Sequence, residues 1–243
     1  MTTGKRTGDD KRNRTASLGV PPGIRTITLC TREDPSMAGT AARYLYLARH
    51  GEALPDESGL TENGRRQAVL LGRRLRESPL AAVLHSPLAR AAETAHLIHG
   101  ELDGVPMEPS ELAGDYIPYV PRKEELPPEY ADSMLDRLAQ FPAEMSELGR
   151  KLAPAALERF ARPVDGDEPR HELVVTHNFL IGWLVRAALD GPKWRWQGLQ
   201  HANAALTVIR YAPDRPASVV FFNDMGHLPA ELRWTGFPPE FRV

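Results

Sequence analysis

Cysteine is scarce in this sequence of 243 residues, which contains only one, Cys30. A single thiol cannot form a disulfide within the chain, and there is no CxxC or Cys/His spacing of the kind that holds zinc or an iron–sulfur cluster. We therefore expect a protein of a reducing compartment, the cytoplasm, with no metal site.

Long hydrophobic runs and an excess charge are lacking as well. No apolar stretch is long enough to span a membrane, and no apolar core follows the basic residues near the N-terminus as it would in a signal peptide. The 30 lysines and arginines nearly balance the 32 acidic residues. Without a global basic field the chain is not expected to bind nucleic acid, and we expect no membrane partner either.

The overall composition is that of an ordinary soluble globular protein, with 42% hydrophobic and 26% charged residues. Residues 1–39 are rich in glycine, proline and aspartate, which predicts a disordered N-terminal extension. Residues 40–243 are long enough to form one domain with a proper core. Prolines crowd the segment from about 104 to 142, which predicts an insertion without long regular elements before about Ala143.

Short apolar runs alternate with helical patterns along the remaining chain. The runs at 44–48, 81–85 and 172–176 are typical of buried strands. A helix capped by Thr61 should follow the first strand, one opened by Ser86–Pro87 should reach about His99, and one opened by His177 should run through Leu189. A further helix is expected over 143–160.

The last two apolar runs, at 206–209 and 219–222, are separated by Pro213–Pro216, which is turn chemistry for an antiparallel hairpin. Strand–helix alternation predicts a parallel sheet. The predicted fold is therefore a three-layer α/β/α domain with a mostly parallel sheet, an antiparallel edge strand and a proline-rich insertion over the active site.

Polar groups follow the ends of three predicted strands, namely Arg49–His50, Ser86 with Arg90, and His177. Ligands of open α/β sheets bind beyond the carboxyl ends of the strands, so these groups could converge. A neutral imidazole presents a lone pair that can attack phosphorus, and the planar arginine fork can hold phosphoryl oxygens. An arginine–histidine pair by itself would be an ordinary surface loop.

Three further motifs accompany Arg49–Glu52, in the order Leu60–Gly64, Ser86–Ala95 and Val174–His177. With these four motifs the chain resembles the histidine phosphatase superfamily, also called phosphoglycerate mutase-like, from about Arg43 to the C-terminal hairpin. The resemblance implies that His50 is the phosphorylated nucleophile, that Arg49 and Arg90 clamp the phosphate, and that His177 completes the pocket.

Family members carry a glycine after the second histidine, where this chain has Asn178, which would contact the phosphate or narrow the pocket. The resemblance also implies a carboxylic acid that protonates the leaving group. Asp115 and Glu111 are both candidates, with Asp115 slightly favoured because a proline follows closely and apolar neighbours would raise its pKa. Glu52 and Ser86 could line the pocket, although capping explains Ser86 equally well.

The expected function is metal-independent hydrolysis of phosphomonoesters through a phosphohistidine on His50, as in a histidine acid-type phosphatase. The substrate is expected to be a small phosphorylated molecule, with no cofactor, and a homodimer is left open. A mutase is one alternative, but Ala53–Gly59 lacks the tryptophans that glycolytic mutases have there. A non-catalytic module for phosphorylated ligands, or a protein phosphatase that recognises its partner through the insertion, are the others.

Overall fold

The computed structural model divides the chain into two units, Met1–Pro35 and Ser36–Val243. It describes residues 1–2 and 39–242, and everything that follows concerns the second unit. The extension predicted for residues 1–39 falls outside the described residues, apart from 1, 2 and 39.

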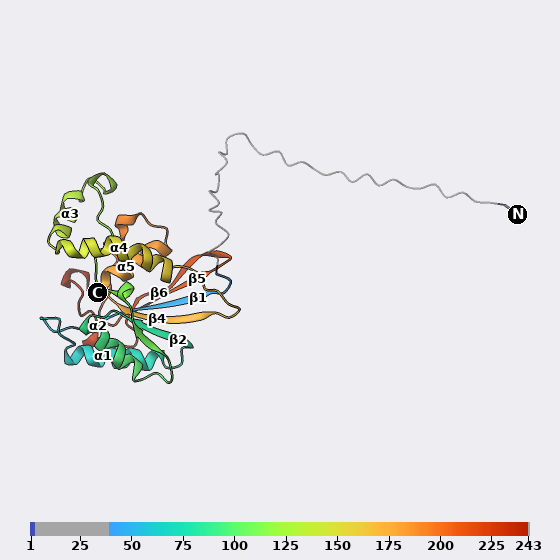
Figure 1. Cartoon of the computed structure of the whole chain (residues 1–243), viewed down its shortest axis with the longest axis horizontal. Coiled ribbons are helices and arrows are strands. Elements are labelled where there is room, and N and C mark those ends of the chain that lie inside the picture. The colour runs from blue at the N-terminus through green and yellow to red at the C-terminus, as the bar shows by residue number, and fades with distance from the viewer. Residues whose placement is uncertain (3–38, 243) are drawn as a thin grey trace. The chain divides into compact units, whose positions relative to one another are not determined.

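The second unit is built on one sheet of six strands in the order β3-β2-β4-β1-β5-β6 (Figure 1). β3, β2, β4 and β1 run parallel, whereas β5 and β6 add an antiparallel hairpin at one edge. The strands are β1 Arg43–Arg49, β2 Leu80–His85, β3 Met107–Pro109, β4 Arg170–Thr176, β5 Leu206–Ala212 and β6 Arg215–Asp224. The predicted fold class is confirmed.

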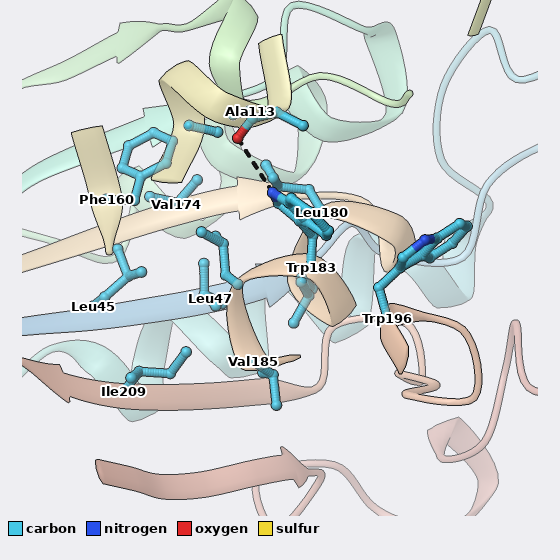
Figure 2. Packing of buried hydrophobic residues seen from close by; sticks show 14 of the residues in the cluster. Leu45, Leu47, Ala113, Phe160, Val174, Leu180, Trp183, Val185, Trp196 and Ile209 are labelled. Carbon is cyan, nitrogen blue, oxygen red and sulfur yellow. Dashed lines mark hydrogen bonds between the residues drawn. The ribbon is translucent and has the colours of Figure 1, made fainter. Parts of the chain in front are cut away.

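Helices cover both faces of the sheet (Figure 1). They are α1 Glu62–Leu75, α2 Ala89–His99, α3 Ala131–Ala139, α4 Ala143–Phe160 and α5 Asn178–Ala188. α1 and α2 pack against one face in a cluster that includes Leu71, Ile98 and Val175. α4 and α5 pack against the other face in a cluster that includes Leu47, Phe160 and Leu180 (Figure 2).

The alternating burial of β1 accounts for this sandwich, because its side chains point to the two faces in turn. Leu45 and Leu47 point to the α4/α5 face and Ala48 to the α1/α2 face, and all three are fully buried. Within the described residues, no helix combines the length and the apolar character needed to cross a membrane.

Three local predictions need correction. The proline-rich insertion contains a nine-residue helix, α3, because its prolines lie on either side of residues 131–139 and leave the helix interior free. The strand β3 also lies within residues 104–142 and extends the sheet. The helix expected from Ser86–Pro87 begins at Ala89, with Leu88 as its N-cap residue and no side-chain cap. The hairpin turn is shorter than expected, since β6 already begins at Arg215.

Candidate active site

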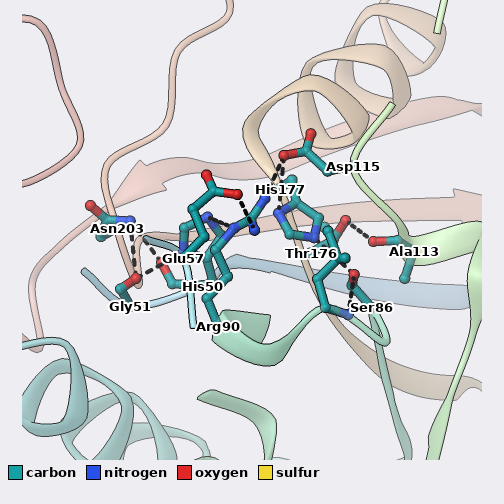
Figure 3. Close-up of polar contacts among 11 residues, drawn as sticks. His50, Gly51, Glu57, Ser86, Arg90, Ala113, Asp115, Thr176, His177 and Asn203 are labelled. Carbon is teal, nitrogen blue, oxygen red and sulfur yellow. Dashed lines mark hydrogen bonds and ion pairs between the residues drawn. The ribbon is translucent and has the colours of Figure 1, made fainter. Parts of the chain in front are cut away.

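The carboxyl ends of β1, β2 and β4 lie side by side and bring three of the sequence motifs together (Figure 3). The backbone N–H of His50 donates to the carbonyl of Thr176 over 3.0 Å, so His50 and His177 leave adjacent strands at the same level. The centroids of their rings are 5.1 Å apart. Parallel pairing therefore places both histidines at one site.

Two glycines allow helix α1 to begin against the loop that holds His50. A Cβ on Gly51 would lie 2.5 Å from the carbonyl oxygen of Gly64, and a Cβ on Gly64 would lie 2.1 Å from that of Glu52. No side chain fits at either position. The backbone N–H of Gly51 also donates to the hydroxyl of Thr94 on α2 over 3.0 Å, which ties the loop to the helix that carries Arg90.

His50 is held in a single tautomer. Its Nδ1 lies 2.8 Å from the carbonyl oxygen of Gly51, which can only accept, so Nδ1 carries the proton and Nε2 carries the lone pair. Arg90 Nε donates to that Nε2 over 3.3 Å. Burial, together with the charge of Arg49, lowers the pKa of His50 to about 3. The imidazole is therefore neutral near pH 7, as a nucleophile must be.

Arg90 links His50 to two carboxylates (Figure 3). Besides its contact with His50, its Nη1 donates to Glu57 over 2.9 Å and its Nη2 donates to Asp115 over 2.7 Å. The side chain is buried to all but 7%. It is thus a fixed cation beside the lone pair of His50.

Arg49 is anchored on one side only. Its Nη1 donates to the carbonyls of His201 and Gly236 over 2.6 and 2.8 Å, whereas its buried Nε has no hydrogen-bond partner. Burial lowers the pKa of Arg49 to about 10, so the guanidinium stays charged at neutral pH. Arg49 lines the same cavity as His50, and its Nε–H is therefore an unpartnered donor at this site.

His177 also has one bound and one unpartnered nitrogen. Its Nε2 lies 2.8 Å from the hydroxyl of Ser86, and its buried Nδ1 makes no hydrogen bond, with Asp115 3.5 Å away. Ser86 accepts from the backbone N–H of Leu88 and has its own proton to give to Nε2, which leaves the proton of His177 on Nδ1. Burial holds the pKa of His177 well below its ordinary value.

The structure separates the two candidate acids. Asp115 contacts both Arg90 and His177, and burial raises its pKa although Arg90 acts in the opposite direction. Gly149 makes room for the loop of Asp115, since a Cβ there would lie 1.7 Å from the carbonyl oxygen of Ile117. Glu111 opens a short 3₁₀ helix with its side chain exposed, and it is not among the residues that line the cavity. The structure does not bring Glu111 to the site.

Four of the residues described above, Arg49, His50, Asp115 and His177, line a cavity of about 260 Å³, whereas Arg90 is not among its lining residues. The other lining residues are Arg137, Phe141, Met145, Asn178, Phe179, Gln200, Gly236 and Pro238. The amide of Asn178 donates to Gln200 and accepts from the backbone N–H of His201, so it fixes the neighbouring loop. The carboxylate of Glu52 instead accepts from Thr61, the N-cap residue of α1, and lies outside the cavity lining.

Sequence reasoning missed two residues that organise the site. Glu57 reaches Arg90 from a loop in which its own backbone has a φ of 58°. Asn203 donates through its side-chain amide to the carbonyl of His50 over 2.9 Å. Neither residue belongs to one of the four motifs, and the sequence analysis carried no signal for either contact.

A neutral histidine beside fixed guanidinium groups and a carboxyl with a raised pKa is the arrangement of an enzyme of phosphoryl transfer. The model of the histidine phosphatase superfamily, branch 1, matches residues 45–224. The chain belongs to this superfamily, as the resemblance in its motifs predicted.

Known relatives agree with the family. The serine/threonine-protein phosphatase Pgam5, mitochondrial, of Caenorhabditis briggsae is 31% identical over 207 residues, which cover 81% of this chain and 68% of that protein. The structure titled Mycobacterial hydrolase 1 has a TM-score of 0.55 at 22% identity and covers 75% of this chain and 99% of its own. Phosphoserine phosphatase from Entamoeba histolytica has a TM-score of 0.54 at 20% identity, with 77% and 100% covered. At these identities the two structures establish the fold.

The protein is accordingly a phosphatase that acts through a phosphohistidine, as the sequence predicted. One expectation is wrong. A cytoplasmic location was inferred from the single cysteine, but the matched Pgam5 relatives are mitochondrial proteins, and this finding overturns it. A low cysteine content indicates a reducing environment and does not distinguish between the compartments that provide one.

Proposed function

We propose that His50 is the nucleophile, and that Arg49, Arg90 and His177 hold the transferred phosphoryl group. The observation that carries the proposal is the pair of buried, unpartnered nitrogens, Nε of Arg49 and Nδ1 of His177, in residues that line the same cavity as His50. A buried donor without a partner costs about 1–3 kcal/mol, which a phosphoryl oxygen would recover. The lone pair of His50 Nε2 forms the bond to phosphorus while the P–O ester bond breaks.

Asp115 is the proton donor in this proposal. Its carboxyl gives a proton to the departing ester oxygen, and its carboxylate then takes a proton from the water that attacks the phosphohistidine. That attack breaks the N–P bond, returns the electron pair to His50 Nε2 and releases inorganic phosphate. The raised pKa of Asp115 keeps a fraction of the carboxyl protonated where an ordinary aspartate would be ionised.

The finer description of an acid-type phosphatase follows from the same groups. His50 stays neutral down to about pH 3, and Asp115 must be protonated to act as an acid, so turnover should be favoured on the acid side of neutrality. Two arginines, each a permanent cation, stabilise the charge that builds up on the phosphoryl oxygens. We therefore propose that hydrolysis does not depend on a metal ion.

The proposed substrate is a small phosphomonoester whose leaving group carries a negative charge. A cavity of about 260 Å³ holds a phosphate group with a short leaving group. Arg137 of α3 also lines this cavity, and its exposed side chain makes no ion pair with any described residue. Together with Phe141 and Phe179, which line the same cavity, Arg137 supports recognition of a carboxylate or a second phosphate.

A second candidate substrate is a phosphorylated serine or threonine in a protein. The names of the Pgam5 relatives favour it, because they describe serine/threonine-protein phosphatases. A non-catalytic binding module is less well supported, since His50, two arginines and Asp115 lie close together as catalysis would require. A mutase is less well supported because Ala53–Gly59 lacks the tryptophans of glycolytic mutases. The absence of nucleic acid and membrane partners, and a homodimer, stay predictions.

The test is release of inorganic phosphate from a panel of phosphomonoesters, including phosphoserine and a phosphoserine peptide, in the presence of EDTA. The wild-type protein should release phosphate, and the His50→Ala variant should not. Faster release from the anionic small esters would support the small-molecule substrate, and faster release from the peptide would replace it. Activity that persists in His50→Ala would exclude His50 as the nucleophile.

A further inference from the structure

A second group of arginines lies at the amino ends of β1 and β4, opposite the end that carries the two histidines. Arg43 and Arg170 are the first residues of these strands and pair with each other in register. Arg159 joins them from the last turn of α4. All three guanidinium groups bind one carboxylate, that of Glu172, whose side chain is 1% exposed.

These contacts saturate the carboxylate but leave donors of Arg170 unused. Arg159 binds both oxygens of Glu172 through its two Nη atoms, over 2.9 and 3.3 Å. Arg170 Nε donates to one of these oxygens over 3.1 Å, and Arg43 Nη1 donates to the other. In the described part of the chain, no hydrogen bond occupies the two Nη atoms of Arg170, whose side chain is 49% exposed. One bidentate arginine is enough to satisfy a carboxylate, so this site has more cations than its acid requires.

Among the described residues that line this space, the excess positive charge is two. Three guanidinium groups face one buried carboxylate, and Arg162 and Asp165, which line the same space, add charges of opposite sign that offset each other. Burial lowers the pKa of Arg43, and Glu172 opposes this effect. The charges of Arg159, Arg170 and Arg162 lower the pKa further. Burial is the largest cause of this shift, and the neighbouring arginines add like charge that an anion in the same space would offset.

These arginines, together with Asp165 and Glu172, line an open cavity of about 300 Å³, comparable to the smaller ligand pockets of proteins. We propose that this arginine cavity, lined by Arg43, Arg159, Arg162 and Arg170, binds a dianionic phosphate group, either inorganic phosphate or a small phosphomonoester. The guanidinium fork matches two phosphate oxygens, and a dianion would cancel the excess charge of two. The site is distinct from the catalytic pocket and does not rest on the proposed function.

Tungstate, a phosphate mimic with strong anomalous scattering, locates the sites directly. Crystals of the full chain soaked in tungstate should show one peak beside His50 and a second between Arg159 and Arg170. The first peak tests the proposed catalytic pocket and the second tests the arginine cavity, so each proposal can fail without the other. A peak in the catalytic pocket alone would overturn the second site.

Calorimetric titration with inorganic phosphate at constant salt then measures affinity. The wild-type protein should bind two phosphates, and Arg170→Gln should weaken one of them by about tenfold or more through loss of a charge-assisted contact. Arg73→Gln, which removes an exposed arginine of α1 paired with Glu101, is the matched control and should bind as the wild type does. Equal affinities in the two variants would refute the arginine cavity.

Discussion

Replacement of Asp115 by asparagine separates the chemistry of the acid from its contacts. Asparagine keeps the size of the side chain but cannot donate a proton to an ester oxygen. General acid catalysis contributes about 10²–10⁴-fold, which corresponds to roughly 2.7–5.4 kcal/mol of the barrier. We expect kcat/KM for an alkyl phosphate, whose alkoxide is a poor leaving group, to fall within this range in Asp115→Asn.

The leaving group makes the prediction sharper. An aryl phosphate such as p-nitrophenyl phosphate releases a stable phenolate that needs no proton, so formation of the phosphohistidine should slow by less than about tenfold in Asp115→Asn. Hydrolysis of the intermediate still needs the carboxylate as a base. Rapid-mixing experiments should therefore show a burst of nitrophenolate equal to the enzyme concentration, followed by slow turnover.

Glu111→Gln provides the matched control, since Glu111 is exposed and lies only four residues before Asp115. Surface substitutions change free energies by about 0.5 kcal/mol or less, which corresponds to about twofold in rate. The reasoning is refuted if both variants lose activity equally, or if Asp115→Asn loses the same factor on alkyl and aryl esters. The descending limb of the pH profile at high pH should also disappear in Asp115→Asn.

Three other properties follow from the structure. Burial lowers the pKa of His201 to about 3 in the folded protein, whereas the unfolded chain protonates it below about 6.5. The resulting stability, complete above pH 6.5, is lost as the pH falls. Between pH 7 and pH 5 this amounts to about 2 kcal/mol, and urea unfolding of His201→Leu should show a pH dependence smaller by that amount. Ser86→Ala should lower kcat/KM by about 10–100-fold by removing the partner of His177, and unchanged kinetics would contradict this role. Gly51→Ala should destabilise the fold by about 1–3 kcal/mol in thermal unfolding, because its Cβ would meet a backbone oxygen at 2.5 Å, whereas Gly100→Ala, with 3.6 Å of room, should be tolerated.

The sequence could reveal His50 and His177 because each directly follows a short apolar strand, and parallel strands bring their carboxyl ends to one edge. Arg90 was found because it lies within a motif on the buried face of a helix. Glu57 and Asn203 could not be found in this way. Glu57 reaches Arg90 across 33 residues from a left-handed backbone conformation, and Asn203 meets the carbonyl of His50 across 153 residues.

Ser86 shows why the local pattern can mislead at a functional site. A serine before a proline and a helical sequence is a good capping signal, and Ser86 does accept from the backbone of Leu88. Its hydroxyl proton, however, is directed to His177, and the helix starts three residues further on. Tertiary contacts decided the role of the side chain, and the sequence around Ser86 carries no record of its partner.

The hydrogen bonds of the site residues show that their side chains are oriented before a substrate binds. His50 Nδ1, His177 Nε2 and Arg49 Nη1 are all tied to the protein, so each residue is oriented through one atom. The nitrogens on the other side of each group, His50 Nε2, His177 Nδ1 and Arg49 Nε, meet only Arg90 or no hydrogen-bond partner. The fold therefore tolerates the unpartnered nitrogens of His177 and Arg49 at about 1–3 kcal/mol each, and in the proposed mechanism a phosphoryl group would find its donors and His50 already oriented.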